Sequence, residues 1–168
     1  FEAKTKGLND WQRAGLKARW GSMQALMSSS SRIDQIAMDV VHDFGVKPRL
    51  SNERGNAMLV AKSIFEASLF YEAFQKTELR GKVGLITSYE PHQSDISREE
   101  DGTNSSTDKQ RLYETYETLL ARVNPSAGKT AAKTYEDEAK RLFVKEPAQM
   151  KLLVVVDKLL TGFDAPSC

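Results

Sequence analysis

The stretch KLLVVVDKLLTGFDAP, residues 151–166, is the part of the sequence that decides the fold. Five consecutive apolar residues, 152–156, are followed directly by polar residues and a glycine. An unbroken apolar run of this length predicts a strand buried on both faces, because a strand with one wet face would alternate apolar and polar residues. Such strands are typical of parallel sheets covered by helices, so the stretch predicts an α/β fold.

A second region of the chain supports the same fold. Residues 57–61, AMLVA, and 83–87, VGLIT, are two more short runs suited to buried strands. Between them, apolar residues recur in helical rhythm over 64–74. Strand, helix and strand, with a crossover long enough for parallel pairing, predict a βαβ unit.

The remaining apolar periodicity predicts three more helices, over 33–44, 112–123 and 132–143. His42 lies off the apolar face of the first of these and is expected to be exposed. Residues 91–108 hold almost no apolar side chains and are expected to form a flexible, solvated loop. We divide the chain into an N-terminal helical or linker segment, 1–32, and an α/β domain, 33–168.

The composition carries no strong signature of a partner. The 168 residues include 24 lysines and arginines against 23 acidic residues, so any basic surface must come from local clustering. No apolar run approaches the ~20 residues that cross a bilayer, which predicts no membrane partner. The sequence does not begin with methionine, and we interpret it as a piece of a longer protein.

The cysteine and histidine counts bear on metals and location. Cys168 is the single cysteine, so an internal disulfide is impossible and a cytoplasmic location is the default expectation. Together with His42 and His92 it leaves too few nitrogen and sulfur ligands for structural zinc. Metal bound by carboxylates alone stays possible without any supporting pattern, and we assign no metal site within these residues.

One motif imitates an ATP site. Gly128-Lys129-Thr130 matches the last three residues of a phosphate-binding P-loop, G-x-x-x-x-G-K-[ST]. The first glycine of that motif is replaced by Val123, and the preceding segment has helical rather than strand periodicity. The motif is therefore interpreted as a turn between two helices.

Polar residues follow each of the three predicted strands. Because the carboxyl ends of parallel strands meet at one edge of a sheet, these residues are expected to form a common polar rim where ligands gather. Hydroxyls beside a glycine let backbone amides approach a phosphate, and a lysine adds a point charge. The groups are Lys62-Ser63, Thr87-Ser88 and Thr161-Gly162-Phe163-Asp164.

At two of these places the sequence resembles a known family. MKLLVVVDKLLTGFDAPSC, 150–168, resembles motif V of the R subunit of type I restriction enzymes, and NAMLVAKSIFEASLFYEAF, 56–74, resembles its motif IV region. The resemblance extends over 33–168. It implies an open, mostly parallel RecA-like sheet, the second lobe of a superfamily-two helicase motor.

The resemblance also implies roles for residues at the rim. Motif IV and the end of the next strand lie on the DNA side in this family, whereas motif V lies between the DNA backbone and the nucleotide. The residues matched to DNA contacts are Lys62, Ser63, Thr87, Ser88 and Thr161. Those matched to the nucleotide interface are Gly162 and Asp164.

In this family the R subunit uses ATP and Mg²⁺ to pull double-stranded DNA past a complex with the methylation and specificity subunits, and cuts with a separate nuclease domain. The first motor lobe, the arginine-bearing motif VI and the nuclease domain have no counterpart in these residues. We thus expect no catalytic residue here, no bound cofactor and no ATP turnover by this piece alone. The alternatives are a lobe of another superfamily-two DNA or RNA helicase, and a non-catalytic α/β module that binds a protein partner.

Overall fold

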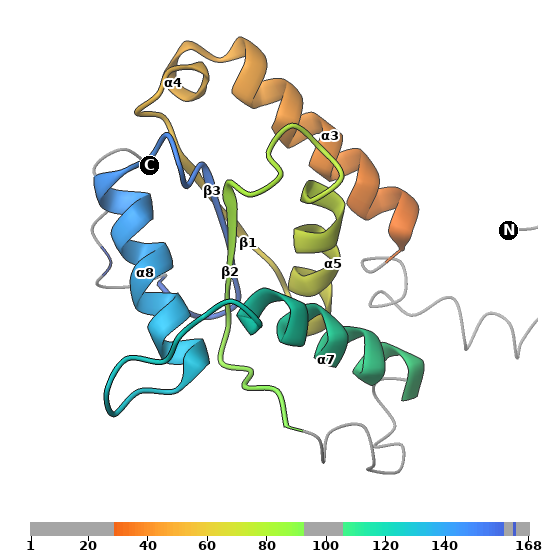
Figure 1. Cartoon of the computed structure of the whole chain (residues 1–168). Coiled ribbons are helices and arrows are strands. Elements are labelled where there is room, and N and C mark those ends of the chain that lie inside the picture. The colour runs from red at the N-terminus through yellow and green to blue at the C-terminus, as the bar shows by residue number, and fades with distance from the viewer. Residues whose placement is uncertain (1–28, 93–105, 160–162, 164–168) are drawn as a thin grey trace, which may run out of the picture.

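The computed structural model describes residues 29–92, 106–159 and 163. Three parallel strands form its sheet: β1 (Ala57–Val60), β2 (Val83–Ile86) and β3 (Leu152–Val155). Helices pack on both faces of this sheet (Figure 1). The predicted α/β class is confirmed, and each strand lies where its apolar run placed it.

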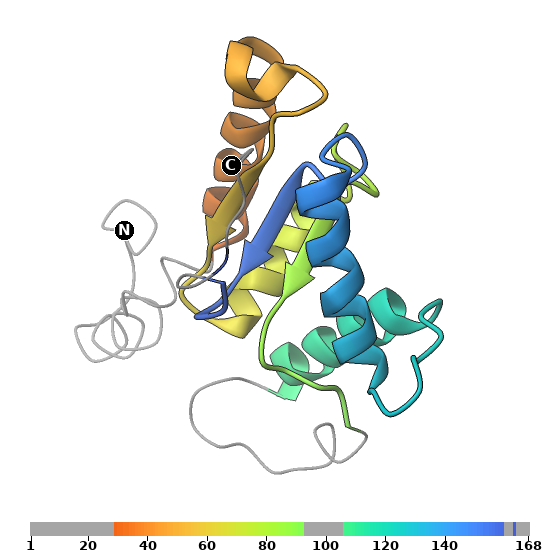
Figure 2. The same cartoon turned by 90° about the vertical axis from the view of Figure 1, so that its left-hand side faces the viewer.

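The strand order differs from the simple βαβ unit. The order is β1-β3-β2, so β1 and β2 are parallel but each pairs only with β3. The two strands with the last strand between them are visible in Figure 2. The central position goes to the most apolar strand, whose four residues are all buried, whereas Val60 at the end of β1 is 55% exposed. Crossover length permits parallel strands but does not fix which ones are neighbours.

One face of the sheet is covered by α3 (Ser30–Val46), α5 (Ile64–Phe74) and α7 (Ser106–Leu120). Leu152 and Val154 of β3 point into this layer. A short helix, α4 (Pro48–Ser51), joins α3 to β1. The main buried residues of the layer are Ile33, Ala37, Phe44, Phe70, Phe74, Leu85, Leu112 and Tyr116.

The opposite face is covered by α8 (Ala131–Lys145), whose Ala139 and Phe143 pack on Leu153 and Val155 (Figure 1). The alternation of Leu152 to Val155 between two cores is the pattern expected of a strand buried on both sides. Gly84 of β2 leaves room for the side chains beside it, because a Cβ there would lie 2.7 Å from Leu153 Cδ2 and 3.2 Å from Met150 Sδ; Ala139 Cβ of α8 would be at the ordinary contact distance of 3.6 Å.

The helix α3 begins before the boundary drawn at residue 33. Its N-cap position is Ser29, and no side chain caps it. Arg32 of α3 forms a salt bridge of 3.1 Å with Glu66 of α5, whose side chain is nearly fully buried. The division into 1–32 and 33–168 remains a prediction, as does the loop at 91–108, since residues 93–105 lie outside the described ranges. Within the described ranges, no helix is both long and apolar enough to span a membrane.

Candidate phosphate-binding edge of the sheet

The three strands end level with one another. Val60 and Ile86 both pair with Val155, so the residues that follow the three strands share one edge of the sheet. The residues that begin α5 and α8 reach the same edge (Figure 2). Lys62, Ser63, Thr87 and Ser88 therefore lie at one edge of the sheet, as expected. The other predicted site residues, Thr161, Gly162 and Asp164, lie outside the described residues.

At the end of β1, Ser63 has a structural role. Its hydroxyl accepts a hydrogen bond from the backbone N–H of Glu66 at 3.1 Å, which caps α5. The carboxylate of Glu66 in turn accepts from the backbone N–H of Lys62 at 2.7 Å. This arrangement is a variant of the capping box. The Lys62 side chain is exposed and forms no ion pair with any residue that the structure describes.

At the end of β2, two adjacent hydroxyls differ in accessibility. Thr87 is 8% exposed; its hydroxyl is hydrogen-bonded to the Tyr116 hydroxyl and accepts from the backbone N–H of Tyr89 at 3.1 Å. Burial raises the pKa of Tyr116 to about 12, with the bond to Thr87 opposing the shift. Ser88 is exposed. Of the two residues predicted here, Ser88 is the one whose hydroxyl faces solvent.

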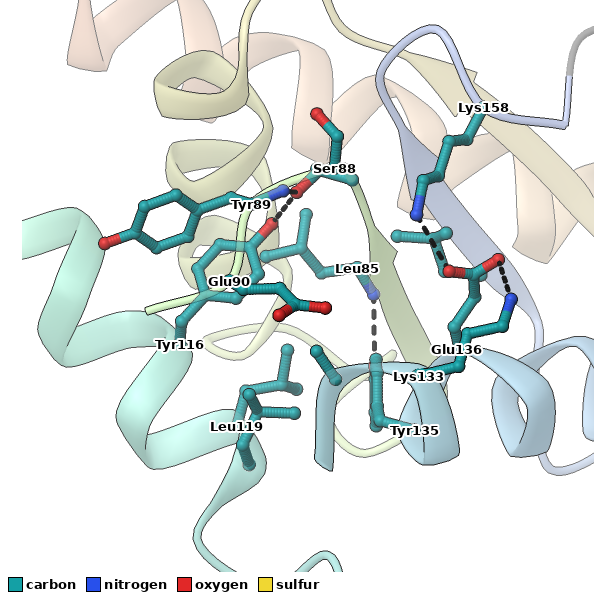
Figure 3. Close-up of a pocket in the computed structure, with 14 residues that line it drawn as sticks. Leu85, Ser88, Tyr89, Glu90, Tyr116, Leu119, Lys133, Tyr135, Glu136 and Lys158 are labelled. Carbon is teal, nitrogen blue, oxygen red and sulfur yellow. Dashed lines mark hydrogen bonds and ion pairs between the residues drawn. The ribbon is translucent and has the colours of Figure 1, made fainter. Parts of the chain in front are cut away.

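Beside these hydroxyls lies a cavity of about 120 Å³, between the end of β2, α7 and the first turns of α8. Figure 3 shows Ser88 on one side of it and Lys158, Lys133 and Glu136 on the other. Lys158 follows β3, whereas Lys133 and Glu136 come from α8. The edge therefore carries a second group of charged residues that the sequence analysis did not single out.

Glu136 is the centre of this group. Its carboxylate accepts from Lys133 Nζ at 3.2 Å and from Lys158 Nζ at 2.8 Å, and Lys140 also bonds to it. Burial raises the pKa of Glu136, but the hydrogen bonds from the three lysines outweigh burial and lower the pKa to about 2. Glu136, which is 8% exposed, is thus an ionised carboxylate held by three cations.

The chain turns sharply after β3. Asp157 and Leu159 have φ angles of 54° and 65°, in the left-handed region that costs a branched residue such as leucine about 1 kcal/mol or more. Leu159 and Phe163 still pack against the α8 core, and the Phe163 ring centroid lies 6.2 Å from that of Phe143. Of the segment that resembles motif V, Leu159 and Phe163 therefore lie on the α8 side of the sheet.

These features agree with the comparison to known families. The family model described as type I restriction enzyme subunit R domain 3 matches residues 53–168, more than half of the chain. The chain belongs to this family. The match begins just before β1 and leaves α3 outside it. No curated protein matches the chain.

The apparent P-loop of this R-subunit domain is a turn between α7 and α8, as predicted. Gly128 has a φ of 77°, and Thr130 caps α8 by accepting from the backbone N–H of Lys133. Lys129 pairs with Asp137 at 2.6 Å. No strand precedes the turn, so Lys129 lacks the setting of a phosphate-binding lysine.

The Glu136 group escaped the sequence analysis because lysines and glutamates on a helix usually lie in solvent. One local signal was present: Lys133, Glu136 and Lys140 are spaced to share one helix face. Lys158 lies 22 residues from Glu136, and only the fold brings the two together. Within the described ranges, the R-subunit domain contains no group of three or more His, Cys, Asp or Glu residues suited to a metal ion.

Proposed function

We propose that this domain is the second lobe of an ATP-driven DNA translocase and contacts the DNA backbone along the carboxyl edge of its sheet. The observation that carries the proposal is the alignment of three strand ends in a type I restriction enzyme R-subunit domain. Ligands of open α/β sheets bind at this edge. Backbone contacts suit a motor that must move along any sequence, because phosphates carry no base information.

The exposed residues at the edge suit such contacts. Lys62 and Ser88 are both exposed there. Ser63 and Thr87 belong to the proposed surface by position, with hydroxyls that already serve the fold. In this proposal Lys62 supplies charge and Ser88 donates a hydrogen bond to a phosphate oxygen.

The nucleotide side of the proposal rests on the family resemblance. Gly162 and Asp164 are proposed to lie at the ATP interface of the full-length R subunit, with Thr161 on the DNA side. ATP with Mg²⁺ is proposed to bind between this lobe and the first, and the methylation and specificity subunits are the proposed protein partners. The chain's own residues would position the nucleotide and the DNA.

The test uses the full-length R subunit. The Lys62→Met and Ser88→Ala variants are expected to weaken DNA binding without changing sequence preference. Loss of the Lys62 charge should reduce the magnitude of the slope of log affinity against log salt by about 0.9, whereas Ser88→Ala removes no charge and should leave that slope unchanged. Asp164→Ala is expected to reduce DNA-stimulated ATP hydrolysis.

Lys47→Met is the matched control, because Lys47 pairs with Asp43 at 2.6 Å just before α4, at the opposite edge of the sheet. It should leave the salt slope unchanged. Absence of DNA-stimulated ATP hydrolysis in the wild type, or undiminished hydrolysis in Asp164→Ala, would refute the proposed function.

A further inference from the structure

One ion pair ties the residues that follow β3 to α8. Lys158 Nζ donates to Glu136 Oε2 at 2.8 Å (Figure 3), although the two residues lie 22 positions apart in the chain. Lys133 and Lys140 bond to the other oxygen of this carboxylate but belong to α8 itself. Among the cations described around Glu136, Lys158 is therefore the one through which the carboxylate can act on another element of the fold.

Glu136 gives this contact a fixed point of attachment. It is 8% exposed, and the bonds to its other oxygen make the pair part of a network, which holds its geometry better than an isolated surface pair. The helix that carries it is fixed to the sheet in turn. Tyr135 accepts from the Leu85 N–H of β2 at 3.1 Å. The carbonyl of the buried Phe143 accepts from Asn56 Nδ2 at 2.7 Å, just before β1.

The backbone on both sides of Lys158 has an unusual conformation. Asp157 and Leu159 have φ angles of 54° and 65°, a region that residues other than glycine occupy rarely and keep only where their surroundings enforce it. Leu159 also packs against the α8 core, and so does Phe163 four residues further on. The ion pair and these apolar contacts therefore fix the described parts of this segment, 157–159 and 163, on the α8 side of the sheet.

We propose that Glu136, acting through Lys158, positions the segment that resembles motif V where it leaves β3. In the proposed function, on which this role rests, that segment lies between the DNA backbone and the nucleotide. Glu136 and Lys158 are thus positioning residues: neither side chain has to touch DNA or ATP, because the pair acts on the placement of the backbone. Both lie outside the polar rim predicted from the sequence.

The step that this pair should affect is ATP hydrolysis by the DNA-bound motor. Displacement of a positioned group by as little as ~1 Å can slow a reaction by up to about 10²-fold. The measured quantities are the rate of ATP hydrolysis per molecule of full-length R subunit bound to DNA, and the KM for ATP. Unfolded molecules do not bind DNA, so division by the bound amount removes the effect of a simple loss of folded protein.

Lys158→Met and Glu136→Gln should each lower this rate severalfold, with the KM for ATP near its wild-type value. The double variant should fall no further, because both changes remove the same contact. Lys158→Arg keeps the charge and should retain most of the rate. Lys140→Met is the matched control: it removes a cation from the same carboxylate but leaves the contact to Lys158 intact, and it should keep the wild-type rate.

Several results would overturn the positioning role. A wild-type rate in Lys158→Met would show that the contact is not needed. A loss in Lys158→Met with a wild-type rate in Glu136→Gln would show that Lys158 acts by a contact of its own. Equal losses in Lys140→Met and Lys158→Met would show that the carboxylate supports the fold as a whole, and equal losses in Lys158→Arg and Lys158→Met would show that the ion pair is not what matters.

Failure of the proposed function would look different. The wild type would then show no DNA-stimulated hydrolysis, or Asp164→Ala would keep it undiminished. With stimulation in the wild type and its loss in Asp164→Ala, the variants of Glu136 and Lys158 test the positioning role alone. Thermal unfolding of each variant confirms that it is folded at the temperature of the assay.

Discussion

The two outer strands of the sheet, β1 and β2, have very different surroundings. Each pairs with β3 along one side, and within the described residues neither has a strand partner along its other side. On β2, the outward N–H of Leu85 donates to the Tyr135 hydroxyl of α8 at 3.1 Å, and all four strand residues are buried. On β1, Val60 is 55% exposed. The described part of the domain thus encloses the β2 side, and the charged cavity lies on that side.

The contrast shows that the helix that covers the β2 edge also carries a charged residue of the candidate site. Free strand edges attract other chains unless they are covered. Here α8 covers the β2 edge with Tyr135 and, on the adjacent residue, supplies the carboxylate that holds Lys158. One helix therefore both protects the sheet and arranges the cavity. Variants on the two sides should differ accordingly.

The largest expected difference comes from Phe143→Ala on the α8 side. Phe143 is fully buried against the sheet, so truncation should lower the free energy of unfolding by about 3–5 kcal/mol. Val60→Ala on β1 is the matched control and should change it by less than about 1 kcal/mol, because that side chain is mostly exposed. Denaturant titration measures both, and comparable losses would abolish the contrast.

Glu136→Gln should have an intermediate effect that depends on pH. The pKa of Glu136 is lowered to about 2 in the folded protein from an ordinary 4.5, so the unfolded chain binds more protons between these values. The stabilisation by the carboxylate is fully present above about pH 5 and is lost as the pH falls toward 2. At neutral pH the variant should be less stable by about 1–2 kcal/mol.

The measurement is the free energy of unfolding of wild type and variant from pH 7 to pH 2. The difference between them should shrink as the pH falls below about 5. A difference that stays constant over this range would mean that the carboxylate charge does not contribute through the three lysines.

The smallest of the three effects is expected for Tyr135→Phe. It removes the acceptor of the Leu85 N–H and should cost about 1 kcal/mol. The Leu85 amide should also exchange its hydrogen faster relative to the amides of β3. Tyr113→Phe is the control, because the Tyr113 hydroxyl donates to Glu117 of the same helix at 3.2 Å, at an exposed position. Equal amide protection in Tyr135→Phe and wild type would show that the hydroxyl does not cover the edge.

Sequence patterns predicted the elements well and their arrangement less well. The apolar runs placed the three strands and the periodicity placed α5 over 64–74, because burial is written into local residue choice. The order of the strands in the sheet could not be predicted, because an apolar run indicates that a strand is buried but not which strands lie beside it. The conclusion that Gly128-Lys129-Thr130 is a turn was available because a P-loop needs a preceding strand.

The site was predictable only as an edge. Of the polar residues that follow the strands, Lys62 and Ser88 are exposed. Thr87 is buried instead, and its hydroxyl is hydrogen-bonded to the hydroxyl of Tyr116, 29 residues later in the chain. The Glu136–Lys158 contact likewise depends on the packing of α8 beside β3. Contacts between distant residues follow from the fold, and a single sequence does not display them.

The central place of β3 also has a consequence for how the chain is made. During synthesis β1 and β2 leave the ribosome first, and β3, the strand that pairs with both of them in the described part of the chain, emerges roughly 65 residues after β2. At about 5–20 residues per second, the wait is on the order of 3–13 s. For that time the apolar segments AMLV and VGLI lack β3, which makes them segments that a chaperone has reason to hold.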